Sequence, residues 1–204
     1  MRSYSPSWSV PRGEFAFEPT DWAFRKLIRN RELNVGLCPQ NLILEKVAIA
    51  DHSRRSLRVQ FRSSWRLFGP QEQPQPQLVD VLTIDEYLEA SAMNKVDFIK
   101  VDVDGYEYKV IKGALRTLQS CKPVLMLEFG HYSLEAVGDR LEDLIDCLIN
   151  LGYAIRWDKE LHLFRDRSEI LRSVPPDSTI NVICLPEPGV SNQSYTRYQG
   201  VSAR

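Results

Sequence analysis

The chain has 204 residues, enough to bury the core of one domain, and its composition is that of an ordinary globular protein. Its formal net charge of −1 gives no general attraction to nucleic acid or to an anionic membrane, so neither is an expected partner. Four widely spaced cysteines form no Cys-x-x-Cys pair, so the sequence predicts no disulfide framework and no metal site. No apolar run reaches the ~20 residues of a membrane helix. We therefore expect a cytoplasmic protein.

Predicted strands and helices alternate along the chain. The expected helices cover residues 21–34, 84–92, a segment after Gly105, and 134–151. The expected strands cover residues 14–18, 42–50, 57–61, 96–103, 122–129, 153–157, 161–164 and 179–185. This alternation predicts an α/β fold with a doubly wound, mostly parallel sheet and an antiparallel hairpin at its C-terminal edge.

Two helix starts carry capping signals. Thr20 or Asp21 is expected to cap the first helix, and Thr83 with Glu86 forms a capping box for the second. Because ligands of doubly wound sheets bind at the carboxyl ends of the strands, residues that end strands are the candidate site residues.

Glu18 is the first acid at a predicted strand end. A carboxylate between a strand and a helix is the usual partner of the ribose hydroxyls of a nucleotide-type cofactor. The alternative is that Glu18 only lies near a helix N-terminus, where the helix dipole favours it.

Asp102 and Asp104 follow the strongest predicted strand. Strand alternation places them on one face with Lys100, which we expect to be their internal counter-ion. The functional interpretation is a pair of site carboxylates. The alternative is a structural N-cap formed by Asp104 and Glu107.

Glu128 and His131 lie close together after the next strand. A carboxylate and an imidazole are a workable pair for activating a hydroxyl by general-base catalysis. The alternative is that His131 is a surface or packing residue.

In unbroken order over about residues 14–157, the sequence resembles the FkbM-type family of S-adenosylmethionine-dependent O-methyltransferases. The matching runs are Phe15-Ala-Phe-Glu-Pro19, Val47-Ala-Ile-Ala-Asp51, Leu82-Thr-Ile-Asp85, Phe98-Ile-Lys-Val-Asp-Val-Asp-Gly-Tyr-Glu107, Ile111-Lys-Gly-Ala114 and Lys122-Pro-Val-Leu-Met-Leu-Glu128.

The resemblance implies a Rossmann-like class I methyltransferase sheet with S-adenosyl-L-methionine as cofactor. Glu18 would hold the cofactor ribose, and Ala48 and Asp51 would line its adenine side. Asp102 and Asp104 would face the methyl group and the substrate, with Glu128 nearby. The family usually has Glu at the position of Asp104. The implied reaction moves a methyl group to a hydroxyl of a small-molecule or carbohydrate acceptor, either a sugar or a natural-product-like compound.

The chain departs from the family pattern at its N-terminus. The family's first strand and glycine loop, which approach the methionine part of the cofactor, have no counterpart, and residues 1–12 contain no glycine. We therefore expect an irregular segment over residues 1–13, a methyltransferase domain truncated at its N-terminus over residues 14–186, and a loose tail over residues 187–204. In the family's sheet order, the absent strand would lie between the strands that end at Glu18 and Asp102.

Three interpretations follow from this departure. The first is an O-methyltransferase whose cofactor binding is weakened, either because the native chain is longer or because another segment fills the gap. The second is a non-catalytic or partner-completed domain of the same fold. The third is another nucleotide-binding protein such as a dehydrogenase. The absence of Gly-x-Gly-x-x-Gly counts against this interpretation as much as the missing glycine loop counts against the first. The sequence leaves the acceptor and the oligomeric state open.

Overall fold

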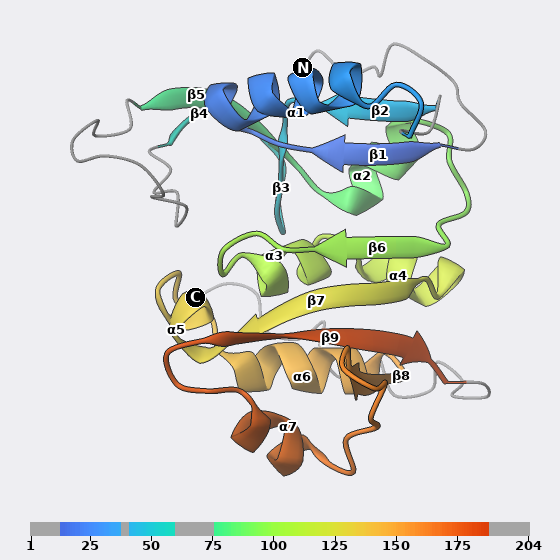
Figure 1. The fold of residues 1–204 in the computed structure, drawn as a ribbon, viewed down its shortest axis with the longest axis vertical. Coiled ribbons are helices and arrows are strands. Elements are labelled where there is room, and N and C mark those ends of the chain that lie inside the picture. The colour runs from blue at the N-terminus through green and yellow to red at the C-terminus, as the bar shows by residue number, and fades with distance from the viewer. Residues whose placement is uncertain (1–12, 38–40, 60–75, 188–204) are drawn as a thin grey trace, which may run out of the picture. The chain divides into compact units, whose positions relative to one another are not determined.

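The computed structural model describes residues 13–37, 41–59 and 76–187 (Figure 1). The chain divides into two compact units, which are described separately below. Unit 1 consists of Met1–Asn94 and Lys112–Leu115, and unit 2 consists of Lys95–Ile111 and Arg116–Arg204. The predicted N-terminal segment and C-terminal tail lie almost entirely outside the described residues, so this division of the chain stays a prediction.

The first sheet of unit 1 contains two parallel strands joined by a helix. Strand β1 (Glu14–Phe17) pairs with β2 (Leu42–Glu45), and α1 (Asp21–Leu33) connects them. The hydroxyl of Thr20 accepts the backbone N–H of Ala23 at 3.3 Å, which confirms the expected cap.

The second sheet of unit 1 has the order β3-β5-β4. Strand β3 (Ala48–Ile49) is parallel to β5 (Gln77–Leu82), and β4 (Arg54–Val59) is antiparallel to it. The expectation of one strand over residues 42–50 was therefore wrong. The chain leaves the first sheet after Glu45 and enters the second at Ala48, with the intervening Val47 buried.

Aromatic side chains pack the core of unit 1. Val47, Leu82 and Tyr87 form a buried cluster, against which Phe15 and Phe17 pack. The Tyr87 ring meets both phenylalanine rings edge-on, with centroid distances of 5.7 and 4.9 Å. Tyr87 lies on α2 (Ile84–Ala90). The hydroxyl of Thr83 accepts the N–H of Glu86 at 3.0 Å, which confirms the expected cap of this helix.

Unit 2 is built on a four-stranded mixed sheet with the order β6-β7-β9-β8. Strand β6 (Phe98–Val101) is parallel to β7 (Val124–Gly130), and β9 (Thr179–Pro186) is antiparallel to both β7 and β8 (Tyr153–Trp157). The expected pairing of residues 153–157 with 161–164 is confirmed in part: Leu163 forms an antiparallel bridge with Arg156, with backbone hydrogen bonds on either side of it, but residues 161–164 do not form a full strand. The main partner of β8 is β9.

Helices connect consecutive strands along this part of the chain. They are α3 (Glu107–Lys112), α4 (Leu115–Cys121), α5 (His131–Glu135), α6 (Leu141–Asn150) and α7 (Arg167–Ser173). The helix expected over residues 134–151 is divided into α5 and α6, since Gly138 turns the chain with a φ of +81°. Along β7, Leu125, Leu127 and Phe129 are fully buried.

Strands β1 and β6 are edge strands among the described residues, as are β2, β3, β4 and β8. Strand β1 pairs with β2, and β6 pairs with β7. The described strands therefore form a mixed α/β fold, and the doubly wound sheet with an absent first strand stays a prediction. No helix in the described part of the chain is long and apolar enough to cross a membrane.

Candidate functional site

The predicted site residues divide between the two units. Glu18, Ala48 and Asp51 belong to unit 1, whereas Asp102, Asp104, Glu128 and His131 belong to unit 2. The predicted site therefore consists of one half-site in unit 1 and another in unit 2, and each is described below from its own contacts.

Glu18 occupies the turn between β1 and α1. Its backbone N–H donates to the carbonyl of Glu45 at 3.0 Å, which ties the turn to the neighbouring strand β2. Its Oε1 accepts the backbone N–H of Thr20 at 2.8 Å and the Thr20 hydroxyl at 2.6 Å. The carboxylate is thus oriented at the helix start, as the structural alternative expected, and it lies at the carboxyl end of β1, where a cofactor would need it.

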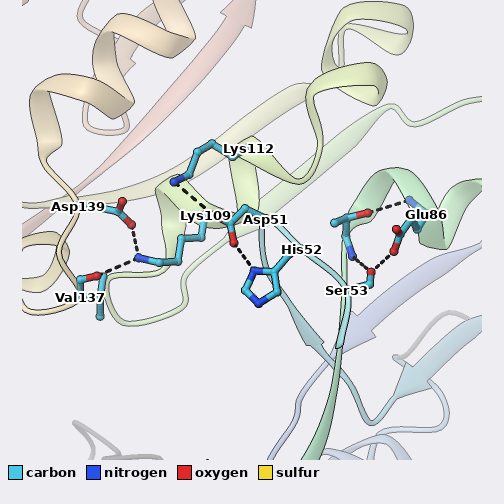
Figure 2. A network of polar contacts seen from close by, with 9 residues as sticks. Asp51, His52, Ser53, Glu86, Lys109, Lys112, Val137 and Asp139 are labelled. Carbon is cyan, nitrogen blue, oxygen red and sulfur yellow. Dashed lines mark hydrogen bonds and ion pairs between the residues drawn. The ribbon is translucent and has the colours of Figure 1, made fainter. Parts of the chain in front are cut away.

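Asp51 follows the short strand β3, which contains Ala48. Its Oδ1 lies 2.8 Å from Nδ1 of His52, and its Oδ2 lies 3.3 Å from Nζ of Lys112 (Figure 2). Partial burial acts to raise the pKa of Asp51, but the hydrogen bond from His52 and the charge of Lys112 outweigh it and lower the pKa below its ordinary value. Asp51 is therefore a fixed carboxylate at a strand end.

A close backbone contact places Lys112 beside Asp51. A Cβ atom on Gly113 would lie 2.0 Å from the carbonyl oxygen of Ala50, so only glycine allows this approach. The carbonyl of Gly113 also accepts the N–H of Asp85 at 3.0 Å. Lys112 and Gly113 belong to one of the runs that resemble the family, but no local sequence pattern predicted this role for them.

In unit 2, Asp102 pairs with Lys100 through a 3.0 Å contact between Nζ and Oδ2. The expected ion pair is confirmed, but the expectation that it is buried was wrong. The side chains of Lys100 and Asp102 are 53% and 48% exposed, because this face of β6 is open at Phe98 and Lys100. The pair is therefore a solvated one.

The loop after β6 has an unusual backbone. Asp104 has a φ of +51° and Gly105 a φ of +100°. A Cβ atom on Gly105 would lie 2.2 Å from the carbonyl oxygen of Ser133 on α5. The carboxylate of Glu107, the first residue of α3, accepts backbone N–H groups of this loop. The structural alternative therefore holds for Glu107, while the role of Asp104 stays a prediction.

Glu128 lies near the carboxyl end of β7. Its Oε1 accepts the hydroxyl of Thr179 on β9 at 2.7 Å. Lys100 on β6 is the register partner of Met126 on the parallel strand β7. Asp102 comes two residues after Lys100, and Glu128 comes two residues after Met126. Both acids therefore belong to the same end of the unit 2 sheet.

His131 begins α5, one residue after β7. Its Nε2 lies 3.3 Å from the carbonyl oxygen of Leu171 on α7. Glu128 and His131 thus have different hydrogen-bond partners, Thr179 and Leu171. This geometry supports the packing alternative for His131, and its role as a general base stays a prediction.

A hollow in unit 1 lies away from these residues. It is lined by Glu14, Leu27, Asn30, Arg31, Asn34, Leu37 and Leu42. Glu14 and Leu42 begin β1 and β2, so the hollow lies at the amino ends of these parallel strands. Ligands of such sheets bind at the carboxyl ends, so the hollow is not the candidate site. Within residues 13–37, 41–59 and 76–187, no three His, Cys, Asp or Glu side chains are grouped to hold a metal ion.

One known protein family matches most of the chain. The Methyltransferase FkbM domain matches residues 3–155, which is more than half of the chain. The chain belongs to the FkbM methyltransferase family. The acids at the ends of β1, β6 and β7 all lie within the part of the chain that matches this family.

One solved structure is similar to the chain, a methyltransferase FkbM from Methylobacillus flagellatus KT. The two share 18% sequence identity with a TM-score of 0.48, and the match covers 84% of the present chain. The chain spans 36% of the length of that protein. No curated protein matches the sequence.

Proposed function

We propose that this FkbM-family chain is an S-adenosyl-L-methionine-dependent O-methyltransferase domain. Its acceptor is a hydroxyl group of a sugar or of a natural-product-like small molecule. The family match over residues 3–155 carries this proposal. Carboxylates after β1, β3 and β6 and near the end of β7 support it, because strand ends are where α/β sheets of this class bind ligands.

The unit 1 half-site suits the nucleoside part of the cofactor. Glu18, oriented by Thr20, offers carboxylate oxygens that accept hydrogen bonds from two vicinal ribose hydroxyls. Asp51, oriented by His52 and Lys112, accepts from the exocyclic amine of adenine, and Ala48 lines the same side. The donor and acceptor chemistry of these residues fits the nucleoside. When bound, the cofactor supplies an electrophilic methyl group on its sulfonium.

The unit 2 half-site suits the acceptor. Asp102 accepts a hydrogen bond from the acceptor hydroxyl and orients its oxygen, while Lys100 fixes one oxygen of that carboxylate. Asp102 also contributes to cofactor binding, and Asp104 lies beside the acceptor. Glu128, held by Thr179, receives the hydroxyl proton, with His131 as the further candidate base.

A second candidate function is a non-catalytic or partner-completed domain. It is favoured by one observation: β1 and β6 each have a single strand neighbour among the described residues. Residues 1–12 also contain no glycine that would form the family's cofactor loop. On this basis we propose that cofactor binding by the 204-residue chain is weak.

Transfer of a labelled methyl group to a panel of glycosides and polyhydroxylated compounds tests the proposal. We expect label in an acceptor hydroxyl, and a loss of about 100-fold or more in Asp102→Asn, the size seen when a group that orients a reactant is removed. Asp97→Asn is the matched control, since Asp97 forms a more exposed pair with Lys95. Cofactor binding without transfer to any acceptor would favour the non-catalytic domain.

A further inference from the structure

The loop between β6 and α3 is held by one buried carboxylate. Oε1 of Glu107 accepts the backbone N–H of Val103 at 3.0 Å and that of Gly105 at 3.2 Å. These two N–H groups flank Asp104, and Val103 directly follows Asp102. A single oxygen atom therefore fixes the backbone on both sides of Asp104 and next to Asp102.

The loop is also fixed on its outer side. Gly105 packs so closely on α5 that a side chain there would collide with the carbonyl of Ser133. Lys109, one turn into α3, donates to the carbonyl of Val137 at 3.0 Å and pairs with Asp139, which ties α3 to the segment after α5 (Figure 2). Glycine tolerates the positive φ of Gly105, whereas a positive φ is uncommon for a residue with a side chain, such as Asp104. The contacts of the neighbouring residues hold Asp104 in this less common conformation.

A buried glutamate at the first position of a helix carries a desolvation cost in free energy. Glu107 is 1% exposed, and its second oxygen, Oε2, is buried without a hydrogen-bond partner. Burying a carboxylate with an unsatisfied oxygen costs several kcal/mol in the absence of compensating bonds. A Ser, Thr or Asp cap, as at Thr20 and Thr83, starts a helix without that penalty. A function beyond helix capping explains why a buried carboxylate is used here.

We propose that Glu107 is a positioning residue that sets the Asp102–Asp104 loop for ligand binding. It does not touch cofactor or acceptor, and it acts by holding the two N–H groups that bracket Asp104. This inference rests on the proposed function, in which Asp102 contacts both ligands. It assigns to Glu107 an effect on affinity that a simple capping or core residue would not have.

Titration of the ¹⁵N-labelled chain with S-adenosylhomocysteine, followed by NMR, tests the inference. Methionine has a similar length but no carboxylate to accept the two N–H groups, so Glu107→Met should weaken binding about 10-fold, the equivalent of ~1.4 kcal/mol. Glu107→Gln keeps one acceptor oxygen for both N–H groups and should restore affinity to within about 3-fold of wild type. Amide hydrogen exchange at Val103 and Gly105 should quicken in Glu107→Met and stay slow in Glu107→Gln.

Val110→Ala is the matched control for lost stability. Val110 is buried in the same helix, but its side chain has no polar contact with the loop. This variant should lower the melting temperature and leave the affinity unchanged. Gly105→Ala perturbs the same loop without changing Glu107. Its Cβ would collide with the carbonyl oxygen of Ser133, so the backbone must move. This variant should also weaken binding.

The outcomes separate this inference from the proposed function. If Glu18→Ala weakens binding but Glu107→Met and Gly105→Ala only lower the melting temperature, as Val110→Ala does, the positioning role is overturned and the proposed function stands. If wild-type protein does not bind S-adenosylhomocysteine at all, both are overturned. If Glu107→Met does not fold, the other two variants test the inference. Weaker binding by Gly105→Ala than by Glu107→Gln supports the positioning role. Wild-type affinity in both variants contradicts it.

Discussion

The ammonium of Lys112 lies 3.3 Å from Oδ2 of Asp51, because Gly113 brings the chain directly against the carbonyl of Ala50. The pair connects the end of α3 to the turn after β3 within unit 1. In the proposed function, the Asp51 carboxylate accepts a hydrogen bond from the adenine amine. The ion pair with Lys112 then orients this carboxylate.

Replacing Lys112 therefore tests the proposed contact between Asp51 and the adenine of the cofactor. Lys112→Met should weaken S-adenosylhomocysteine binding by about 2- to 5-fold, because a partly exposed ion pair contributes up to ~1 kcal/mol. Calorimetric titration measures this change. Lys95→Met removes a lysine from a far more exposed pair and should leave the affinity unchanged. Equal effects of the two variants would remove Asp51 from the cofactor site.

Gly113→Ala should destabilise the protein strongly. Its Cβ would lie 2.0 Å from the Ala50 oxygen, so the backbone at Ala50 or Gly113 must move. We expect a loss of about 2 kcal/mol or more in the free energy of unfolding, measured in urea. Gly36→Ala is the control, since nothing lies within 4 Å of the added atom, and it should change stability by less than ~0.5 kcal/mol. A neutral Gly113→Ala would show that the close approach is not required.

Asp102→Asn separates catalysis from structure. Since the Lys100–Asp102 pair is about half exposed, the loss of its charge should reduce stability by less than ~1 kcal/mol. Methyl transfer should fall sharply in the same variant. The two quantities are measured by urea unfolding and by label transfer. A variant that is destabilised by several kcal/mol but fully active would exclude Asp102 from the catalytic residues.

The stability of Glu107→Gln should depend on pH relative to wild type. Burial first, and also the charge of Glu128, raise the pKa of Glu107 above its ordinary value, despite the backbone N–H bonds that oppose this shift. The folded wild type then binds this proton more tightly than the unfolded chain. The contribution of Glu107 to the free energy of unfolding therefore decreases as pH rises from about 4.3, the ordinary value, through the raised pKa.

Glutamine at position 107 does not titrate, so Glu107→Gln should gain stability relative to wild type across that pH range and hold a constant difference above it. Urea unfolding of both proteins at pH values from 4 to 8 measures the difference, in which the other titrating groups cancel. A wild type that becomes more stable than Glu107→Gln as pH rises would contradict the raised pKa.

Local sequence signals predicted the parts of the fold that depend on neighbouring residues. The caps at Thr20 and Thr83 and the strand that contains Lys100 were correct, because each depends on residues within a few positions. Strand β5 and helix α7 were not predicted. Strand β5 begins at Gln77, directly after Pro76, and residues 60–75 before it lie outside the described part of the chain.

Long-range contacts account for the site features that were not predicted. Lys112 reaches Asp51 only because Gly113 packs on Ala50, and no local pattern signals that approach. The exposure of the Lys100–Asp102 pair depends on what covers β6, which strand alternation does not reveal. Glu107 was placed in a cap with Asp104, but its burial and its unpartnered Oε2 became evident only from the fold.

Calorimetric titration of the 204-residue chain with S-adenosylhomocysteine, compared with Glu18→Ala, tests whether the chain binds this cofactor product through the carboxylate of Glu18. We expect saturable binding that is weaker than micromolar, and a further loss of about 10-fold in Glu18→Ala with little change in melting temperature, since a charge-assisted bond to ribose is removed. Glu14→Ala, at the other end of β1, should bind like wild type. An absence of binding at millimolar ligand, or equal affinity in wild type and Glu18→Ala, would contradict the account.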